Sequence, residues 1–144
     1  MSLSACLAGH GLSQHVRRGL QAMGKHSKCV QVQHGKVTAS ADLDTALAQR
    51  LPNEPRWDYG LEIAAGNGTR LVWIEVHPAI SSEVEAVCRK LRWLRQFLKQ
   101  SQACQTLPHA FHWVATDSGV HIDATRRRRL AAVGLKMPTQ CVSV

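Results

Sequence analysis

Three side chains on two neighbouring segments have types and spacing suited to acting on one substrate: Asp58, Glu75 and His77. Mg²⁺ prefers oxygen ligands and is commonly held by one or two carboxylates, with waters and phosphate oxygens completing its shell. Such an ion polarises a phosphoryl oxygen and lowers the pKa of a bound water. We therefore take Asp58 and Glu75 as candidate Mg²⁺ ligands, with Mn²⁺ as a substitute ion. All three side chains are candidate catalytic residues.

Residues 57–78, WDYGLEIAAGNGTRLVWIEVHP, must position this group. Two alternating runs flank Asn67-Gly68, a dipeptide typical of tight β-hairpin turns. With these two residues as the loop, Asp58 lies opposite His77, and Glu75 lies opposite Gly60, which leaves room for a ligand. Alternation then predicts a core face and a polar face. The core face holds Tyr59, Leu61, Ile63, Val72, Ile74 and Val76, and the other holds Asp58, Glu62, Trp73, Glu75 and His77.

The rest of the chain alternates between helical and strand patterns. A capping box of Ser82 and Glu85 opens a long amphipathic helix over about residues 82–100. Its apolar stripe is Val84, Val87, Cys88, Leu91, Leu94 and Leu98. Further helices are predicted over 12–23, briefly within 42–51, and over 124–134, the last capped by Asp123 or Thr125. A hairpin of 29–33 with 37–41, strands at 111–116 and 120–122 joined by a turn, and a terminal strand at 141–144 complete the prediction.

This order of elements resembles the PD-(D/E)xK restriction-endonuclease-like fold over roughly residues 12–122. The resemblance implies one α/β domain, residues 1–144, with a mixed sheet flanked by helices. It also implies that Asp58 and Glu75 bind Mg²⁺ and that His77 stands where the family has a lysine that orients or activates the attacking water. Trp57 occupies the place of the family's proline. His77 exchanges a fixed charge for an imidazole that is mostly neutral at pH 7.

Charge favours a polyanionic partner. The chain has a net charge of +8, and residues 88–144 hold ten basic and two acidic side chains, whereas residues 1–87 hold eight of each. A one-sided positive field favours nucleic acid, here DNA, through contacts with phosphates. The candidate nucleic-acid-binding residues are Arg89, Arg92, Lys99, Arg126, Arg127, Arg128 and Arg129. Trp93 and Trp113 are either base-stacking platforms or core residues.

Composition excludes several classes of protein. No apolar run is long enough for a membrane span, and the first residues lack the basic start of a secretion signal. Five widely spread cysteines without a C-x-x-C pair predict reduced thiols and a cytoplasmic protein. No Walker A, G-x-G-x-x-G, H-E-x-x-H or G-x-S-x-G motif occurs.

Other interpretations remain open at this stage. The acidic face could be a solvated surface, and the protein could be a noncatalytic module that binds nucleic acid on a nuclease-like fold. A protein-interaction domain that forms a homodimer through the long helix is a further alternative. A zinc site from Cys104, His109, His112 and His121 and a Cys-His nucleophile pair are the weakest hypotheses, because neither matches a standard spacing.

Overall fold

The computed structural model describes residues 2–144, without the side chains of residues 117 and 118. The strands are β1 (Arg17–Arg18), β2 (Val30–Gln31), β3 (Lys36–Asp42), β4 (Tyr59–Ala65), β5 (Gly68–Ile80), β6 (His109–His121) and β7 (Val142–Ser143). The α-helices are α1 (Leu3–Ala8), α2 (Leu43–Leu47), α3 (Val84–Lys99), α4 (Gln102–Gln105) and α5 (Ala124–Ala132). Three 3₁₀ segments are η1 (Ser13–His15), η2 (Gln21–Cys29) and η3 (Ser81–Glu83). No helix within this described part is both long enough and apolar enough to cross a bilayer.

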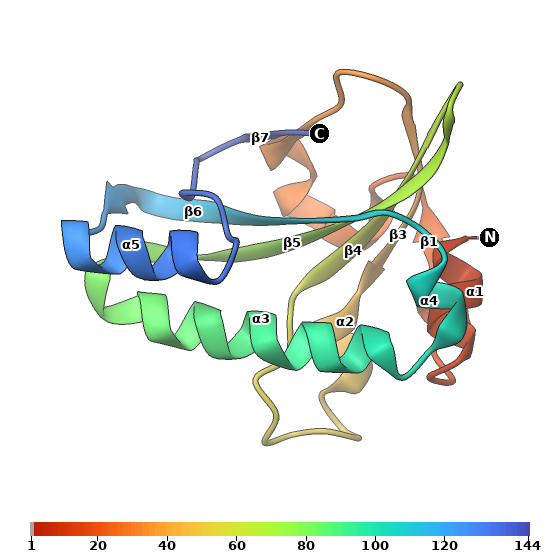
Figure 1. Cartoon of the computed structure of the whole chain (residues 1–144). Coiled ribbons are helices and arrows are strands. Elements are labelled where there is room, and N and C mark those ends of the chain that lie inside the picture. Colours follow the sequence, from red (N-terminus) through yellow and green to blue (C-terminus); the bar gives the residue numbers. More distant parts are fainter. Residues whose placement is uncertain (1) are drawn as a thin grey trace.

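A mixed sheet with the order β1-β3-β4-β5-β6 forms the centre of the protein. Neighbouring strands are antiparallel from β1 to β5, whereas β5 and β6 are parallel. A parallel pair needs a long crossover, and α3 supplies it. In Figure 1 α3 runs along one side of the sheet, with α5 beside it. The predicted α/β class, with a mixed sheet flanked by helices, is therefore confirmed.

Apolar side chains fill both sides of the sheet. On the helical face, which is covered by α1, α3, α4 and α5, Trp73 and Trp113 pack among leucines of these helices. On the opposite face, Leu61, Ile63 and Val72 pack against η2 and the C-terminal segment. All six apolar residues of the predicted α3 stripe are buried. The predicted capping box is wrong, because α3 begins two residues after Ser82, behind η3, and no side chain caps it.

The hairpin of β4 and β5 forms as predicted, but its register differs by two residues. Ala65 pairs with Gly68 across a loop of Gly66 and Asn67. A turn centred on Asn67-Gly68 would need positive φ at both residues. Instead Gly68 alone has positive φ, +129°, the pattern of a turn closed by a glycine bulge. Because the shift is even, each side chain keeps its predicted face, but Asp58 now lies level with Glu75 rather than with His77.

The N-terminal part departs most from the prediction. Residues 12–23 do not form a helix, because Arg17 and Arg18 pair with β3 as an edge strand and Gly19 adopts a positive φ of +48°. The first helix is α1 instead, capped by the Ser2 hydroxyl. The predicted hairpin of 29–33 with 37–41 is also wrong, since β2 pairs in parallel with β7 and β3 pairs with β1 and β4.

The later elements mostly agree with the prediction. The brief helix, the last helix and the terminal strand are confirmed as α2, α5 and β7, and Asp123 caps α5. Residues 111–116 and 120–122 were expected as two strands joined by a turn. They belong instead to one strand, β6, whose two halves both pair with β5 across a register shift. The short helix α4 was not predicted.

Cysteine chemistry also differs from expectation. Cys6 and Cys104, which are 98 residues apart, form a disulfide that joins α1 to α4. Both residues are fully buried. The prediction of five reduced thiols is therefore wrong for this pair, whereas Cys29, Cys88 and Cys141 are free.

Candidate functional site

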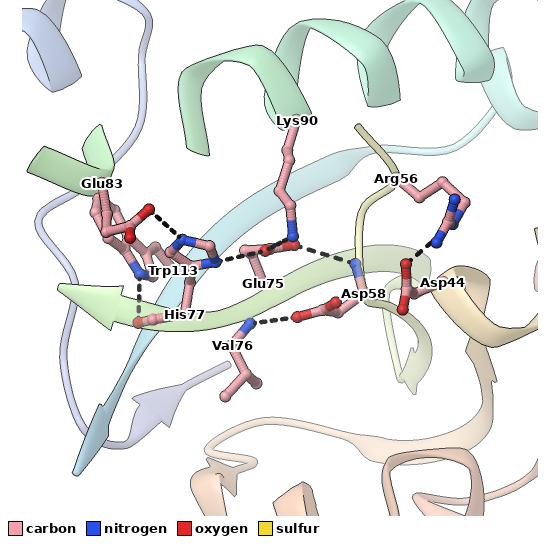
Figure 2. Close-up of polar contacts among 9 residues, drawn as sticks. All are labelled: Asp44, Arg56, Asp58, Glu75, Val76, His77, Glu83, Lys90 and Trp113. Carbon is pink, nitrogen blue, oxygen red and sulfur yellow. Dashed lines mark hydrogen bonds and ion pairs between the residues drawn. The ribbon is translucent and has the colours of Figure 1, made fainter. Parts of the chain in front are cut away.

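Asp58 and Glu75 meet where β4 begins beside β5. The Asp58 backbone N–H donates to Glu75 Oε1 at 3.2 Å, and the Val76 N–H donates to Asp58 Oδ2 at 2.9 Å (Figure 2). Each carboxylate thus accepts a backbone hydrogen bond from the neighbouring segment. The predicted convergence of these two acids is present, and the corrected register brings them closer together than the predicted one.

Glu75 is fully buried and is surrounded by cations. Lys90 reaches down from α3 and its ammonium contacts Glu75 Oε2. His77 Nδ1 lies 3.4 Å from the same oxygen. A buried carboxylate is costly unless it is paired and hydrogen-bonded, and Glu75 satisfies both conditions. Glu75 is therefore held in place beneath α3 by contacts to both of its oxygens.

Asp58 lacks such a direct cationic partner. Burial and then the negative charge of Glu75 raise the pKa of Asp58 to about 7, although the Val76 hydrogen bond and Lys90 act in the opposite direction. The carboxyl group thus changes its protonation state near neutral pH. Carboxyl groups with this property act as general acids, general bases and cation ligands at functional sites.

His77 is held between two carboxylates. Its Nε2 lies 3.0 Å from Glu83 Oε2, and its backbone carbonyl accepts a hydrogen bond of 3.0 Å from Trp113 Nε1. Hydrogen bonding to Glu75 raises the pKa of His77, burial lowers it in part, and Glu83 raises it again, with a net increase. The expected mostly neutral imidazole is therefore shifted towards the protonated form. This favours a role for His77 as a charge partner of Glu75 over that of a free base.

Lys90 was not among the predicted site residues. Burial lowers its pKa, but the attraction and hydrogen bonding of Glu75 outweigh burial and the net shift is upward. Its position could have been recognised from the sequence, since Lys90 lies three residues after Val87 and four before Leu94, on the buried stripe of α3. A lysine on a buried stripe needs an acidic partner beneath it, and Glu75 is that partner.

A second polar contact anchors the start of β4. Arg56 Nε lies 3.0 Å from Asp44 Oδ1 (Figure 2). The Leu43 N–H donates to the Asp58 carbonyl at 2.8 Å. The short helix α2 thereby fixes the backbone on either side of Asp58. Asp58 therefore lies on a segment held both at Arg56 and at its own carbonyl.

The donor chemistry around Asp58 and Glu75 fits hydrated Mg²⁺, since the ion takes one or two carboxylates and keeps several waters. Within residues 2–144, no cluster of three or more His, Cys, Asp or Glu side chains is arranged to hold a metal ion. Glu75 Oε2 also contacts Lys90 and His77. A metal at this site would therefore rely on two carboxylates, and Lys90 would have to move away from Glu75.

The predicted phosphate-binding residues fall into three groups. Arg126 pairs with Asp123 at 3.0 Å, Arg129 pairs with Glu85 at 2.9 Å, and Arg127 donates to the Ile122 carbonyl at 3.0 Å. In contrast, Arg92 and Lys99 line a hollow of about 160 Å³ together with Arg95. This hollow thus brings three basic side chains together on the surface of α3. Arg89 and Arg128 are exposed on α3 and α5.

The structure also bears on the weaker hypotheses. Cys104 is in a disulfide, and His109 bonds Trp73 Nε1 at 2.8 Å and the Cys104 carbonyl at 2.6 Å, so two of the four proposed zinc ligands are otherwise engaged. Trp113 is buried and cannot stack on a base. Trp93 is only partly buried and stacks on Phe97 with a centroid distance of 5.0 Å.

Comparisons with protein-family models, with curated proteins and with solved structures each find no match for this chain. Any functional conclusion therefore depends on the site itself.

Proposed function

We propose that this protein is a restriction-endonuclease-like nuclease that cleaves DNA phosphodiesters with Mg²⁺, for which Mn²⁺ can substitute. The observation that carries the proposal is the meeting of Asp58 and Glu75 at the start of the β4–β5 hairpin, with Lys90 directly above Glu75. The succession of α1, the antiparallel strands β3 to β5, the crossover α3 and the parallel strand β6 supports the same fold family.

Each residue has a role that its surroundings support. Asp58 and Glu75 would hold the ion, which when bound would supply positive charge to a phosphoryl oxygen. Asp58, with a pKa of about 7, can give up its proton near neutral pH to accept a cation. Lys90 contacts the buried Glu75 carboxyl group, and it takes the cationic position that the resemblance assigned to His77. His77 supports Glu75 from the other side.

The basic surface over α3 and α5 supports nucleic acid as the substrate. Arg92, Arg95 and Lys99 are grouped around one hollow, and planar guanidinium groups suit phosphate oxygens. Arg89 and Arg128 extend the positive surface. Arg126, Arg127 and Arg129 contribute charge while their head groups hold α5 in place.

A cleavage assay tests the proposal. Supercoiled, linear and single-stranded DNA are incubated with Mg²⁺ or Mn²⁺, and we expect cleavage that Asp58→Ala and Glu75→Gln each reduce by at least about a hundredfold. Glu54→Gln removes the same charge as Glu75→Gln from an exposed position and serves as the matched control. Circular dichroism of each variant separates loss of chemistry from loss of fold.

Cation binding gives a second measurement that does not depend on turnover. Because Asp58 is partly protonated at pH 7, binding of Mg²⁺ should release a proton, and the calorimetric enthalpy should change with the ionisation enthalpy of the buffer. Asp58→Asn should abolish this dependence. Binding with no proton release would contradict the assignment of Asp58 as a ligand.

A noncatalytic nucleic-acid-binding or protein-interaction module on the same fold is the second candidate. It is favoured by one observation, that both oxygens of Glu75 already have partners within the fold. Salt-sensitive DNA binding without cleavage in any divalent metal would support this alternative and overturn the first proposal. A homodimer that binds DNA no better than its net charge predicts would favour the protein-interaction form.

A further inference from the structure

A pair of free cysteines lies at the point where the C-terminus returns to the N-terminal part of the chain. Strands β2 and β7 are parallel, with Val30 paired to Val142 and Gln31 to Ser143. The ladder continues beyond these pairs, since Val144 donates to the Gln31 carbonyl and accepts from the Gln33 N–H, both at 2.8 Å. In Figure 1 the dark-blue C-terminal segment ends beside the orange segment that contains β2.

Cys29, the last residue of η2, and Cys141 each lie one residue before the first pair of this ladder. Each of the two pairs joins residues that are 112 positions apart, and Cys29 and Cys141 have the same separation. Paired strands lie about 4.8 Å apart. This spacing falls within the Cα–Cα range of about 4.4–6.8 Å that a disulfide spans without backbone movement.

Both thiols open into the same cleft. Cys29 and Cys141 line a cavity of about 350 Å³ with Lys28 and Thr116. Cys29 is half-buried and Cys141 is exposed, so a reagent in solution can reach them. By contrast, Cys88 is buried, and burial raises the pKa of its thiol. The chain therefore contains two accessible thiols and one protected thiol.

The cleft continues into a positively charged cavity. The adjoining space of about 390 Å³ shares Lys28, Cys29 and Thr116 and adds Lys25 and His26. Among the side chains that the structure describes, which exclude those of residues 117 and 118, none that lines either cavity is acidic. A cationic wall beside accessible thiols favours approach by a small anionic disulfide, of which glutathione disulfide is the available probe.

We propose that Cys29 and Cys141 form a reversible disulfide site that is oxidised by a small anionic disulfide. The resulting bond covalently links the segment before β7 to the segment before β2. The exposed Cys141 thiolate attacks one sulfur of the donor, whose S–S bond breaks and releases one donor thiolate. The Cys29 thiolate then attacks the Cys141 sulfur and releases the second donor thiolate. The two cysteines lose two electrons, the donor gains them, and the two protons end on the released thiols.

Thiol counting and peptide mapping test this proposal. Wild-type protein should expose three free thiols on denaturation and only one after treatment with glutathione disulfide, with a peptide joining Cys29 to Cys141 by mass spectrometry under non-reducing conditions. Cys29→Ser should instead accumulate a glutathione adduct on Cys141. Cys88→Ser is the matched control, and it should still form the cross-link and leave no free thiol.

Mild reduction separates this bond from the existing one. The fully buried Cys6–Cys104 disulfide should persist while the Cys29–Cys141 bond reopens. Three free thiols after oxidation, adducts on both cysteines without a cross-link, or a bond formed only between two chains would each overturn the proposal.

Discussion

The Asp58 carboxyl group is more stable protonated inside the fold than ionised. An aspartate in an unfolded chain titrates near pH 3.9, whereas burial and Glu75 raise the pKa of Asp58 to about 7. Below about pH 4 the Asp58 carboxyl group is protonated in both the folded and the unfolded chain, and the stability that its raised pKa provides is fully present. As the pH rises through 7, ionisation favours the unfolded chain and this contribution is lost, at a cost of at most about 4 kcal/mol. The ionised form of Asp58 therefore lowers the stability of the fold, and groups that do so are common at functional sites.

Asp58→Asn should therefore stabilise the protein at alkaline pH. An asparagine side chain still offers an oxygen to the Val76 N–H, and it removes the repulsion from Glu75. We expect the free energy of unfolding to rise by about 1–3 kcal/mol at pH 8 and to change little at pH 4.5. Urea unfolding at the two pH values is the measurement. An equal effect at both would show that the Asp58 charge does not oppose folding.

Single residues show how far the sequence could define the site. The alternation of the hairpin placed Asp58, Glu75 and His77 on one face, because a register error of two residues leaves every face unchanged. Because the predicted register placed Asp58 opposite His77, it did not predict the direct contact of Asp58 with Glu75. The helical pattern could place Lys90 on the buried stripe of α3, but it does not show which strand packs beneath that stripe, so the partner Glu75 could not be predicted.

The β4–β5 hairpin depends on one close contact between its strands. Gly60 lies opposite Trp73, and a Cβ at position 60 would come within 2.4 Å of the Trp73 ring. That ring is fully buried and its Nε1 donates to His109 at 2.8 Å, so it cannot easily move aside. The glycine predicted to leave room for a ligand instead makes room for a tryptophan.

Gly60→Ala should consequently destabilise the hairpin. Overpacking of a rigid core site costs about 1–3 kcal/mol, and we expect a loss in this range with weaker near-ultraviolet dichroism from the tryptophans. Gly66→Ala in the loop of the same hairpin is the control, because nothing lies within 4 Å of its Cβ position. A loss no larger than that of the control, about 0.5 kcal/mol or less, would mean that Trp73 adapts.

The helices and strands predicted best are those whose own residues carry a strong hydrophobic pattern. The apolar stripe of α3 and the alternation of β4 and β5 are strong local signals, and both elements form. Residues 12–23 have helical spacing, yet Arg17 and Arg18 complete the sheet edge beside β3. Pairing with a distant strand there outweighs a local preference that no cap reinforces.

At the scale of the whole molecule, the Cys6–Cys104 disulfide connects the N-terminal helix to the segment that leads into β6. The sequence could not indicate this pair, because residues 98 positions apart give no local sign of proximity. A cross-link over so long a loop restricts the unfolded chain strongly. The expectation of a cytoplasmic protein was based on reduced thiols, and this disulfide removes that basis. The basic excess of residues 88–144 does not depend on the disulfide.

Removal of this cross-link should lower stability without changing the fold. We expect the double variant Cys6→Ala, Cys104→Ala to lose about 2–5 kcal/mol in urea unfolding under non-reducing conditions. Cys141→Ser, which alters an exposed free thiol, is the control and should change stability by about 0.5 kcal/mol or less. Identical midpoints for wild type and the double variant would contradict a stabilising role.

The parallel pairing of β5 with β6 has a consequence for biosynthesis. When the ribosome has released β5, its partner on one side, β4, is already present, but residues 109–121 have yet to be made. Until then the nascent chain presents an unsatisfied row of amide and carbonyl groups next to Val72, Ile74 and Val76, the kind of edge on which polypeptides aggregate. Because α3 packs on the helical face, and Val72, Ile74 and Val76 lie on the other face, this edge of β5 stays open until β6 has been made and pairs with it.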